Sequence, residues 1–355
     1  MEIRKILKSM VESEASDLYL RLSASPHMRV DGKVTKMDFQ ELTGDDMTII
    51  SNYLLENDAR KREFIEKQDI DFIHVDADHG RFRINMFMQR GTTAIVARYV
   101  HSKIKTFKEL HLPEELCKMF CEEASGLFLV CGPAGNGKST TIASMLEYIN
   151  NNQSKHVITI EDPVEYLFED KKCLISQREL GIDVPSYTSA LKHVTQQSPD
   201  IMFIGNIRDE STMKAAITAT ELGTFVMTTF HTVNAVQTII RIVNFFPPYL
   251  HDEVRMQLSM ILRGVVSIRL LPRIDGQGRV PAFETMVVTP TIARLIREGK
   301  TREVQAYIDE GEVFGMKSFK RSLLDLVKAG IVDENDARIY ADSKTDFDLG
   351  IKGVQ

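Results

Sequence analysis

The residues best suited to chemistry form a glycine-rich loop near the middle of the chain. An apolar run, 127–131, precedes the loop and predicts a buried strand, and apolar residues at helical spacing follow it from Ser139 to Ile149. Every fixed position of the P-loop pattern is filled. The loop consists of Gly132, Pro133, Ala134, Gly135, Asn136, Gly137, Lys138 and Ser139, and Thr140 follows it.

Each part of this loop suits a phosphate group. Glycines let the backbone bend so that successive N–H groups, and the positive end of the following helix, point at phosphate oxygens. Lys138 offers a mobile positive charge to the β- and γ-phosphates, and Ser139 offers a hydroxyl to Mg²⁺. We therefore predict that the loop and Thr140 bind a nucleoside triphosphate. The alternative is a glycine-rich turn that binds nothing.

Carboxylates follow a second predicted strand, 157–160, at Glu161, Asp162 and Glu165. Sheets of α/β proteins place ligands at the carboxyl ends of their strands. A P-loop enzyme needs an acid there to help hold Mg²⁺, and a group that positions or deprotonates water. We predict that Glu161 and Glu165 act in catalysis and that Ser139 and Glu165 bind Mg²⁺. The alternative is a capped loop with solvated acids.

Two further strand ends carry polar side chains. The predicted strand from Ile201 to Gly205 has the apolar composition of a Walker B element, but it is followed by Asn206, which is not an acid. The predicted strand from Thr224 to Phe230 delivers His231 beside hydroxyl groups. A lone histidine at a strand end is usually structural, so the sequence leaves its role open.

Composition limits the class of protein. The net charge of −6 argues against a general nucleic-acid coat, although a local basic groove could exist. No uncharged apolar run approaches the length of a membrane span, and the first residues lack the apolar core of a signal peptide. The four cysteines form no CxxC pair. We expect a cytoplasmic chain without a transmembrane segment.

The chain is long for one core, and its patterns predict three regions. Residues 1–105 combine a long helix from Asp45 to Glu66 with strands of alternating polarity, which predicts a small α+β domain. A polar stretch from Ser102 to Leu112 ends before a proline and predicts a linker. Strands alternate with helices in 106–289, the pattern of a P-loop α/β core with a mostly parallel sheet, and 290–355 is helical.

Several motifs, in this order and spacing, resemble the secretion ATPase superfamily, and within it the PilT/PilU motors that retract type IV pili, with a lean toward PilU. The resemblance extends over nearly the whole chain. Two stretches, 15–18 and 29–32, resemble the PAS-like N-terminal domain of the family, and 80–83 resembles its arginine-bearing segment. The stretch 159–165 resembles the Asp box, and 230–232 falls in the His box. The stretches 177–179 and 241–247 are family-like, the second together with 181–183 leans toward PilU, and 290–298 resembles a C-terminal segment associated with retraction.

This resemblance implies an ATP-binding subunit of a cytosolic hexameric motor for pilus retraction and twitching motility. It implies ATP and Mg²⁺ as ligands, and as partners further copies of the chain, an active retraction ATPase paralogue and an inner-membrane pilus platform protein. The chain would then be peripheral at the inner membrane. Arg81, Arg83 and Arg98 resemble the arginines that reach the nucleotide and stabilise developing phosphate charge. Solvated strand faces are the alternative for these three.

The departures from the family pattern concern catalysis. The family has a glutamate, assigned to activating the attacking water, where this chain has Asn206; an amide can hold water but cannot take up its proton. Thr224 stands where the family has a histidine, and Gln196 where it has an arginine. We therefore expect slow hydrolysis. Alternatively, Glu165 or Glu161 supplies the base, or the chain is an inactive scaffold that modulates an active paralogue. The acidic balance and the absence of an aromatic–basic stripe disfavour a nucleic-acid translocase.

Overall fold

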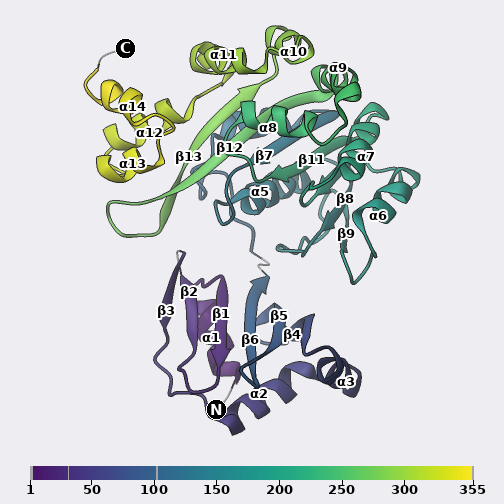
Figure 1. The fold of residues 1–355 in the computed structure, drawn as a ribbon, viewed down its shortest axis with the longest axis vertical. Helices are drawn as coiled ribbons and strands as arrows, with labels where there is room; N and C mark the ends of the chain where they lie inside the picture. The colour runs from purple at the N-terminus through teal and green to yellow at the C-terminus, as the bar shows by residue number, and fades with distance from the viewer. Residues whose placement is uncertain (1–2, 31, 101–102, 354–355) are drawn as a thin grey trace. The chain divides into compact units, whose positions relative to one another are not determined.

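The computed structural model describes residues 3–30, 32–100 and 103–353, in two compact units (Figure 1). The first unit is Met1–Lys103 with Glu165–Leu167, and the second is Ile104–Val164 with Phe168–Gln355. Residues 101 and 102, where the predicted linker begins, lie outside the described residues. Each unit has its own hydrophobic core, so each is described by itself.

The first unit is a six-stranded antiparallel sheet with helices packed on one face. Its strand order is β3-β2-β1-β6-β5-β4. Apolar side chains at helical spacing in the first helix, Ile6 and Met10 among them, pack with Phe82 and Ile84 of the sheet. The elements are α1 (Ile3–Glu12), β1 (Asp17–Arg21), β2 (His27–Val30), β3 (Lys33–Lys36), α2 (Gly44–Leu55), α3 (Asp58–Lys67), β4 (Asp69–Asp76), β5 (Gly80–Gln89) and β6 (Thr92–Val100).

The single helix predicted from Asp45 to Glu66 is wrong, because the structure has two helices there. The first, α2, ends at Leu55, and Glu56 then takes a positive φ of 52°. The side chain of Asn57 accepts a hydrogen bond from the backbone N–H of Arg60 and so caps the second helix. Asparagine is a favoured N-cap residue, since its side chain satisfies a backbone donor that the helix leaves unpaired.

The second unit is built on a seven-stranded sheet with the order β13-β12-β7-β11-β10-β8-β9 (Figure 1). Adjacent strands from β12 to β9 are parallel, and β13 pairs antiparallel with β12. The strands are β7 (Gly126–Cys131), β8 (His156–Glu161), β9 (Leu174–Glu179), β10 (Ile201–Ile204), β11 (Phe225–Phe230), β12 (Leu262–Pro272) and β13 (Arg279–Val287). This confirms the predicted α/β core with a mostly parallel sheet.

Helices cover both faces of this sheet. One face carries α4 (Glu114–Cys121) and α5 (Lys138–Asn152), and the other carries α6 (Tyr187–Val194), α7 (Glu210–Glu221), α8 (Ala235–Val243) and α9 (His251–Ile261). Every residue of β7 and of β11 is buried as a result. Burial on both faces is why β7 is a continuous apolar run in the sequence and why β11 is mostly apolar. The four cysteines are free thiols buried within this unit.

The helical region predicted from residue 290 packs within the second unit. Its helices are α10 (Pro290–Arg297), α11 (Val304–Glu310), α12 (Phe319–Lys328), α13 (Glu334–Tyr340) and α14 (Lys344–Ile351). The last three share a small core with apolar residues of β12 and β13. Arg269 of β12 stacks on Phe319 and pairs with Asp342. None of the helices within the described ranges is long and apolar enough to span a membrane.

Candidate nucleotide-binding site

The glycine-rich loop lies between β7 and α5, where the sequence predicted it. Gly132, Gly135 and Gly137 have φ values of 146°, 74° and 83°, a region that favours glycine. At Gly132 a Cβ atom would lie 2.5 Å from the carbonyl oxygen of Ile268 on the neighbouring strand. A side chain is therefore excluded at the first turn of the loop, both by its conformation and by the close approach of β12.

Contacts from β12 and β13 hold the loop in place. The Asn136 side chain accepts a hydrogen bond from the backbone N–H of Leu270 at 2.8 Å and donates to the carbonyl of Ala134 at 3.2 Å. Arg279 donates to the carbonyl of Gly135 at 3.2 Å. The loop is thus braced from outside as well as bent by its glycines, so its backbone N–H groups are ordered before a ligand arrives.

Lys138, at the start of α5, is buried, with 7% of its surface exposed. Its Nζ donates to the carbonyl oxygens of Gly132 and Pro133, at 2.9 Å each, and lies 3.2 Å from Nδ1 of His231. Because a lysine ammonium only donates, Nδ1 of His231 must be the acceptor, which assigns the proton of a neutral imidazole to Nε2. The structure thus brings together the P-loop lysine and the histidine whose role the sequence left open.

The charge state of His231 follows from its neighbours. Partial burial, and then the positive charges of Lys138, Arg208 and Arg241, lower the pKa of His231 below its usual 6.5. Each of these cations disfavours a further positive charge on the imidazole. His231 is therefore neutral at neutral pH, in the state that the contact with Lys138 requires.

Strand order explains which predicted residues approach the P-loop. β11 pairs directly with β7, with Phe230 opposite Cys131, so His231 follows at the edge of the sheet beside the loop. β10 and then β8 come next in the sheet. At about 4.8 Å per strand, the ends of β10 and β8 lie about 10 and about 14 Å from the P-loop strand. Asn206 is therefore nearer to the loop than Glu161.

The carboxylates predicted at the metal have different surroundings. Glu161 is buried at the end of β8 and accepts hydrogen bonds from Thr159 at 2.6 Å and Gln177 at 3.3 Å. Glu165 belongs to the first unit, so its role with Mg²⁺ stays a prediction. No group of three or more histidine, cysteine, aspartate or glutamate side chains that could hold a metal occurs among the described residues. The predicted ligands Ser139 and Glu165 fit Mg²⁺, because this ion binds through few protein oxygens together with substrate phosphates.

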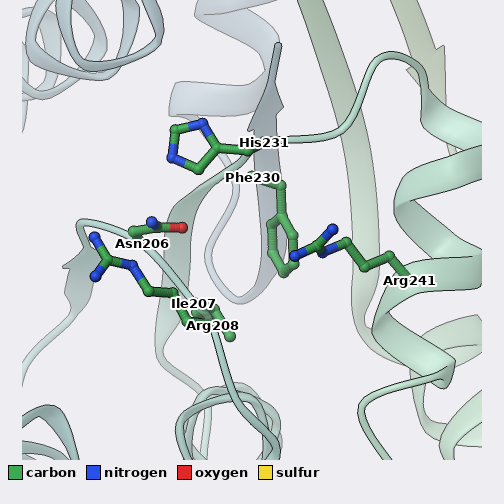
Figure 2. A pocket seen from close by; sticks show the side chains of 6 residues that line it. All are labelled: Asn206, Ile207, Arg208, Phe230, His231 and Arg241. Carbon is green, nitrogen blue, oxygen red and sulfur yellow. The ribbon is translucent and has the colours of Figure 1, made fainter. Parts of the chain in front are cut away.

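A cavity of about 420 Å³ opens beside His231 (Figure 2). In Figure 2 the side chains of Asn206 and His231 both line the cavity, and the Arg241 guanidinium lies near the ring of Phe230. The sequence assigned no role to Arg208 or Arg241. Two features of the sequence could have drawn attention to them: Arg208 lies two residues after Asn206, and Arg241 begins the family-like stretch 241–247. The lining residues are Asn206, Ile207, Arg208, Phe230, His231 and Arg241.

Tyr187, the first residue of α6, is a second polar group that the sequence did not single out. Its hydroxyl is buried next to the backbone of Gly205 and lacks a hydrogen-bond partner of normal geometry among the described residues. Burial, and then the charge of Asp162, raise the pKa of Tyr187 to about 12. The phenol is therefore protonated, and it packs beneath the turn that carries Asn206.

The predicted arginines lie on one face of the sheet in the first unit. Arg83 and Arg98 are direct cross-strand neighbours; Arg83 pairs with Asp71 at 3.1 Å, and Arg98 with the buried Asp17 at 2.9 Å. Nε of Arg81 is buried and makes no hydrogen bond within the described part of the chain. Two of the three therefore have a structural partner within their own unit, and their action on nucleotide stays a prediction.

Two of the three departures from the family pattern lie away from the P-loop edge. Thr224 precedes β11, so about 20 Å of extended chain separates it from His231. Its hydroxyl donates to the carbonyl of Pro199 at 3.4 Å, next to the short 3₁₀ helix Thr195–Gln197 that contains Gln196. Both positions belong to the amino-terminal edge of the sheet. Asn206 is the departure at the carboxyl edge, where the candidate site lies.

Comparison with known proteins identifies relatives over the whole chain. The model of a family described as type II/IV secretion system protein matches residues 1–337. The chain is 36% identical over 354 residues to the type IV pilus ATPase PilU of Pseudomonas aeruginosa, covering 99% of this chain and 92% of that protein. It is 38% identical over 347 residues to the retraction ATPase PilT of the same organism, covering 98% of this chain and 100% of that protein.

A solved structure shares the fold. The crystal structure of the pilus retraction motor PilT with bound ADP matches with a TM-score of 0.87 and 39% sequence identity, over 98% of each chain. The predicted combination of an N-terminal domain with a P-loop α/β core is confirmed by this match and by the two sheets described above. The family resemblance read from the motifs is confirmed as well.

Proposed function

This chain belongs to the type II/IV secretion system protein family, and from that premise we propose that it is an ATP-binding subunit of a cytosolic hexameric motor that retracts type IV pili in twitching motility. Its relatives are named pilus ATPases, and the chain is an ATPase of this family. One observation carries the proposal: the braced P-loop with Lys138 held between loop carbonyls and His231.

The roles follow from the chemistry of each group. The P-loop backbone, Lys138 and Thr140 bind the phosphates of ATP, and Ser139 with Glu165 holds Mg²⁺, which neutralises charge on the β- and γ-oxygens. When phosphate oxygens reach the loop, they replace its carbonyls as partners of Lys138. Arg81, Arg83 and Arg98 stabilise charge that develops during transfer, from their own or a neighbouring subunit.

Asn206 sets the expected rate. It is a strand-end polar group that lines the same cavity as His231, and none of the lining residues in the described part of the chain is a carboxylate. The carboxamide positions water without accepting its proton, and loss of a general base typically lowers the rate by about 10²–10⁴. We therefore propose slow hydrolysis. The same observation favours a second function, a nucleotide-binding scaffold that modulates an active retraction ATPase paralogue at an inner-membrane pilus platform protein.

Steady-state ATPase measurements on Asn206→Glu test the assignment. Introducing a base should raise turnover by at least about tenfold over the unmodified protein. Asn206→Gln is the matched control, because it has the length of glutamate and no basic oxygen, and its turnover should stay low.

Measurements with and without an active retraction ATPase separate the motor from the scaffold. Intrinsic turnover identifies a motor, whereas an effect on the paralogue alone identifies a scaffold. Fast hydrolysis by the unmodified protein would contradict the role given to Asn206 and point to Glu165 or Glu161 as the base.

A further inference from the structure

The cavity beside His231 presents positive charge and hydrogen-bond donors. Arg208 and Arg241 line it from two different segments, and neither forms an ion pair with a carboxylate within the described ranges. Arginine guanidinium groups bind phosphate through parallel, charge-assisted hydrogen bonds. A cavity with two such groups, and with no acidic residue among the described residues that line it, favours an anion.

The other two polar residues of the lining add donors. Because Nδ1 of His231 accepts from Lys138, its Nε2 carries a proton that can be donated to a ligand. The Asn206 carboxamide contributes N–H groups to the same lining (Figure 2). Burial, and then the positive charges of Lys138, Arg208 and Arg241, lower the pKa of His231, which agrees with the cationic lining.

The cavity also has a suitable position. His231 separates it from Lys138, whose Nζ is 3.2 Å from the imidazole, so the cavity adjoins the place where the P-loop holds the terminal phosphate. Its volume of about 420 Å³ accommodates a tetrahedral oxyanion with water. Hydrolysis joins the γ-phosphorus to a water oxygen, breaks its bond to ADP and releases phosphate at this point.

We propose that this cavity is a binding site for inorganic phosphate, the product that leaves the P-loop after hydrolysis. The inference rests on the proposed ATPase function and deepens it. A glutamate at position 206 would place a negative charge opposite His231 and repel the product. Asn206 removes that repulsion, so the substitution that slows hydrolysis also favours retention of phosphate.

Calorimetric titration of inorganic phosphate into the full chain loaded with ADP and Mg²⁺ tests the site. Arg208→Gln and Arg241→Gln should each weaken phosphate binding by about tenfold or more, since each removes charge-assisted hydrogen bonds. Asn206→Glu should weaken it as well, and Asn206→Gln should not. Arg302→Gln is the matched control, because Arg302 is an exposed arginine that lines a different cavity of the same unit.

A second arm distinguishes free phosphate from the γ-phosphate of intact nucleotide. Affinity for a non-hydrolysable ATP analogue should be nearly unchanged in the arginine variants. If these variants weaken the analogue and leave phosphate binding intact, the cavity serves the bound nucleotide and the proposal is wrong. Equal phosphate affinity in all variants would also overturn it.

The failure of this inference is distinguishable from failure of the proposed function. If the unmodified protein binds ADP but shows no phosphate binding, only the product site is refuted. Absence of ADP binding would refute the nucleotide site itself. Thermal melting checks that each variant is folded, and Asn206→Glu provides the test on its own if an arginine variant does not fold.

Discussion

Glu284 provides a pH-dependent prediction that the structure makes quantitative. This carboxyl on β13 has 1% of its surface exposed, and it accepts a hydrogen bond at 2.8 Å from the backbone N–H of Ala235, the first residue of α8. Burial raises the pKa of Glu284 to about 7, although the bond from Ala235 lowers it. Because α8 follows the segment that carries His231, this carboxyl anchors an element next to the candidate site.

The sign of the effect follows from proton binding. In the unfolded chain the glutamate titrates near 4.5, so between pH 4.5 and 7 the folded state binds more protons. The stability contributed by the protonated carboxyl is fully present below pH 4.5 and is lost as the pH rises through about 7. Within the range from pH 5.5 to 8.5 the loss occurs over the about 1.5 pH units below the folded-state pKa of about 7. The free energy of unfolding therefore falls by about 2 kcal/mol.

Glu284→Gln removes the titration and keeps an oxygen that can accept from Ala235. Relative to the unmodified protein, the variant should gain stability as the pH rises, by about 2 kcal/mol between pH 5.5 and 8.5. For a unit of this size, about 2 kcal/mol corresponds to a shift of about 4–8 °C in the melting temperature. Thermal melting of both proteins at half-unit steps from pH 5.5 to 8.5 measures the difference.

A matched control variant and two possible outcomes test whether Glu284 titrates as argued. Glu253→Gln, at an exposed position on α9, should give melting temperatures parallel to those of the unmodified protein. If the Glu284→Gln difference is constant across the pH range, the buried carboxyl does not titrate as argued. If the variant is less stable by the same amount at every pH, the hydrogen bond to α8 matters and the charge does not.

The remaining predictions concern the nucleotide. Lys138→Ala should weaken ATP binding by at least about tenfold, because the phosphates lose a charge-assisted donor; titration with a fluorescent ATP analogue measures this, and unchanged affinity in a folded variant contradicts the P-loop assignment. Arg81→Ala should lower ATP turnover with little change in melting temperature, whereas Arg98→Ala should also destabilise the first unit, because Asp17 loses an ion pair at 2.9 Å. Parallel losses of turnover and stability in Arg81→Ala would make that arginine structural.

The parts of the fold that the sequence predicts are those set by local pattern. The strand, loop and helix around Lys138 follow from residue spacing, since the required φ values favour glycine and a strand buried on both faces favours an apolar run. The prediction failed at Glu56, where periodicity continued through a helix boundary. The cap at Asn57 was a local signal that could have located this break.

The parts that the sequence did not predict depend on strand order. Inserting β11 between β7 and β10 brings His231 to Lys138 and leaves Glu161 three strands away, and no local pattern encodes that order. The same topology places Thr224 at the opposite edge, although it is only seven positions from His231. Arg208 and Arg241 line one cavity because two segments that are distant in the sequence lie beside it.

The electrostatics of this cavity connect the proposed slow turnover with the proposed phosphate binding. Burial, and then the positive charges of Lys138, Arg208 and Arg241, lower the pKa of His231. The same charges would lower the pKa of a carboxylate introduced at position 206, which keeps it ionised but makes it a weaker base. Asn206→Glu should therefore restore only part of the rate that a general base supplies, while its negative charge acts in full against bound phosphate. Under these proposals the exchange of asparagine for glutamate should change phosphate affinity as well as turnover, and measuring both on the same variant shows which of the two changes more.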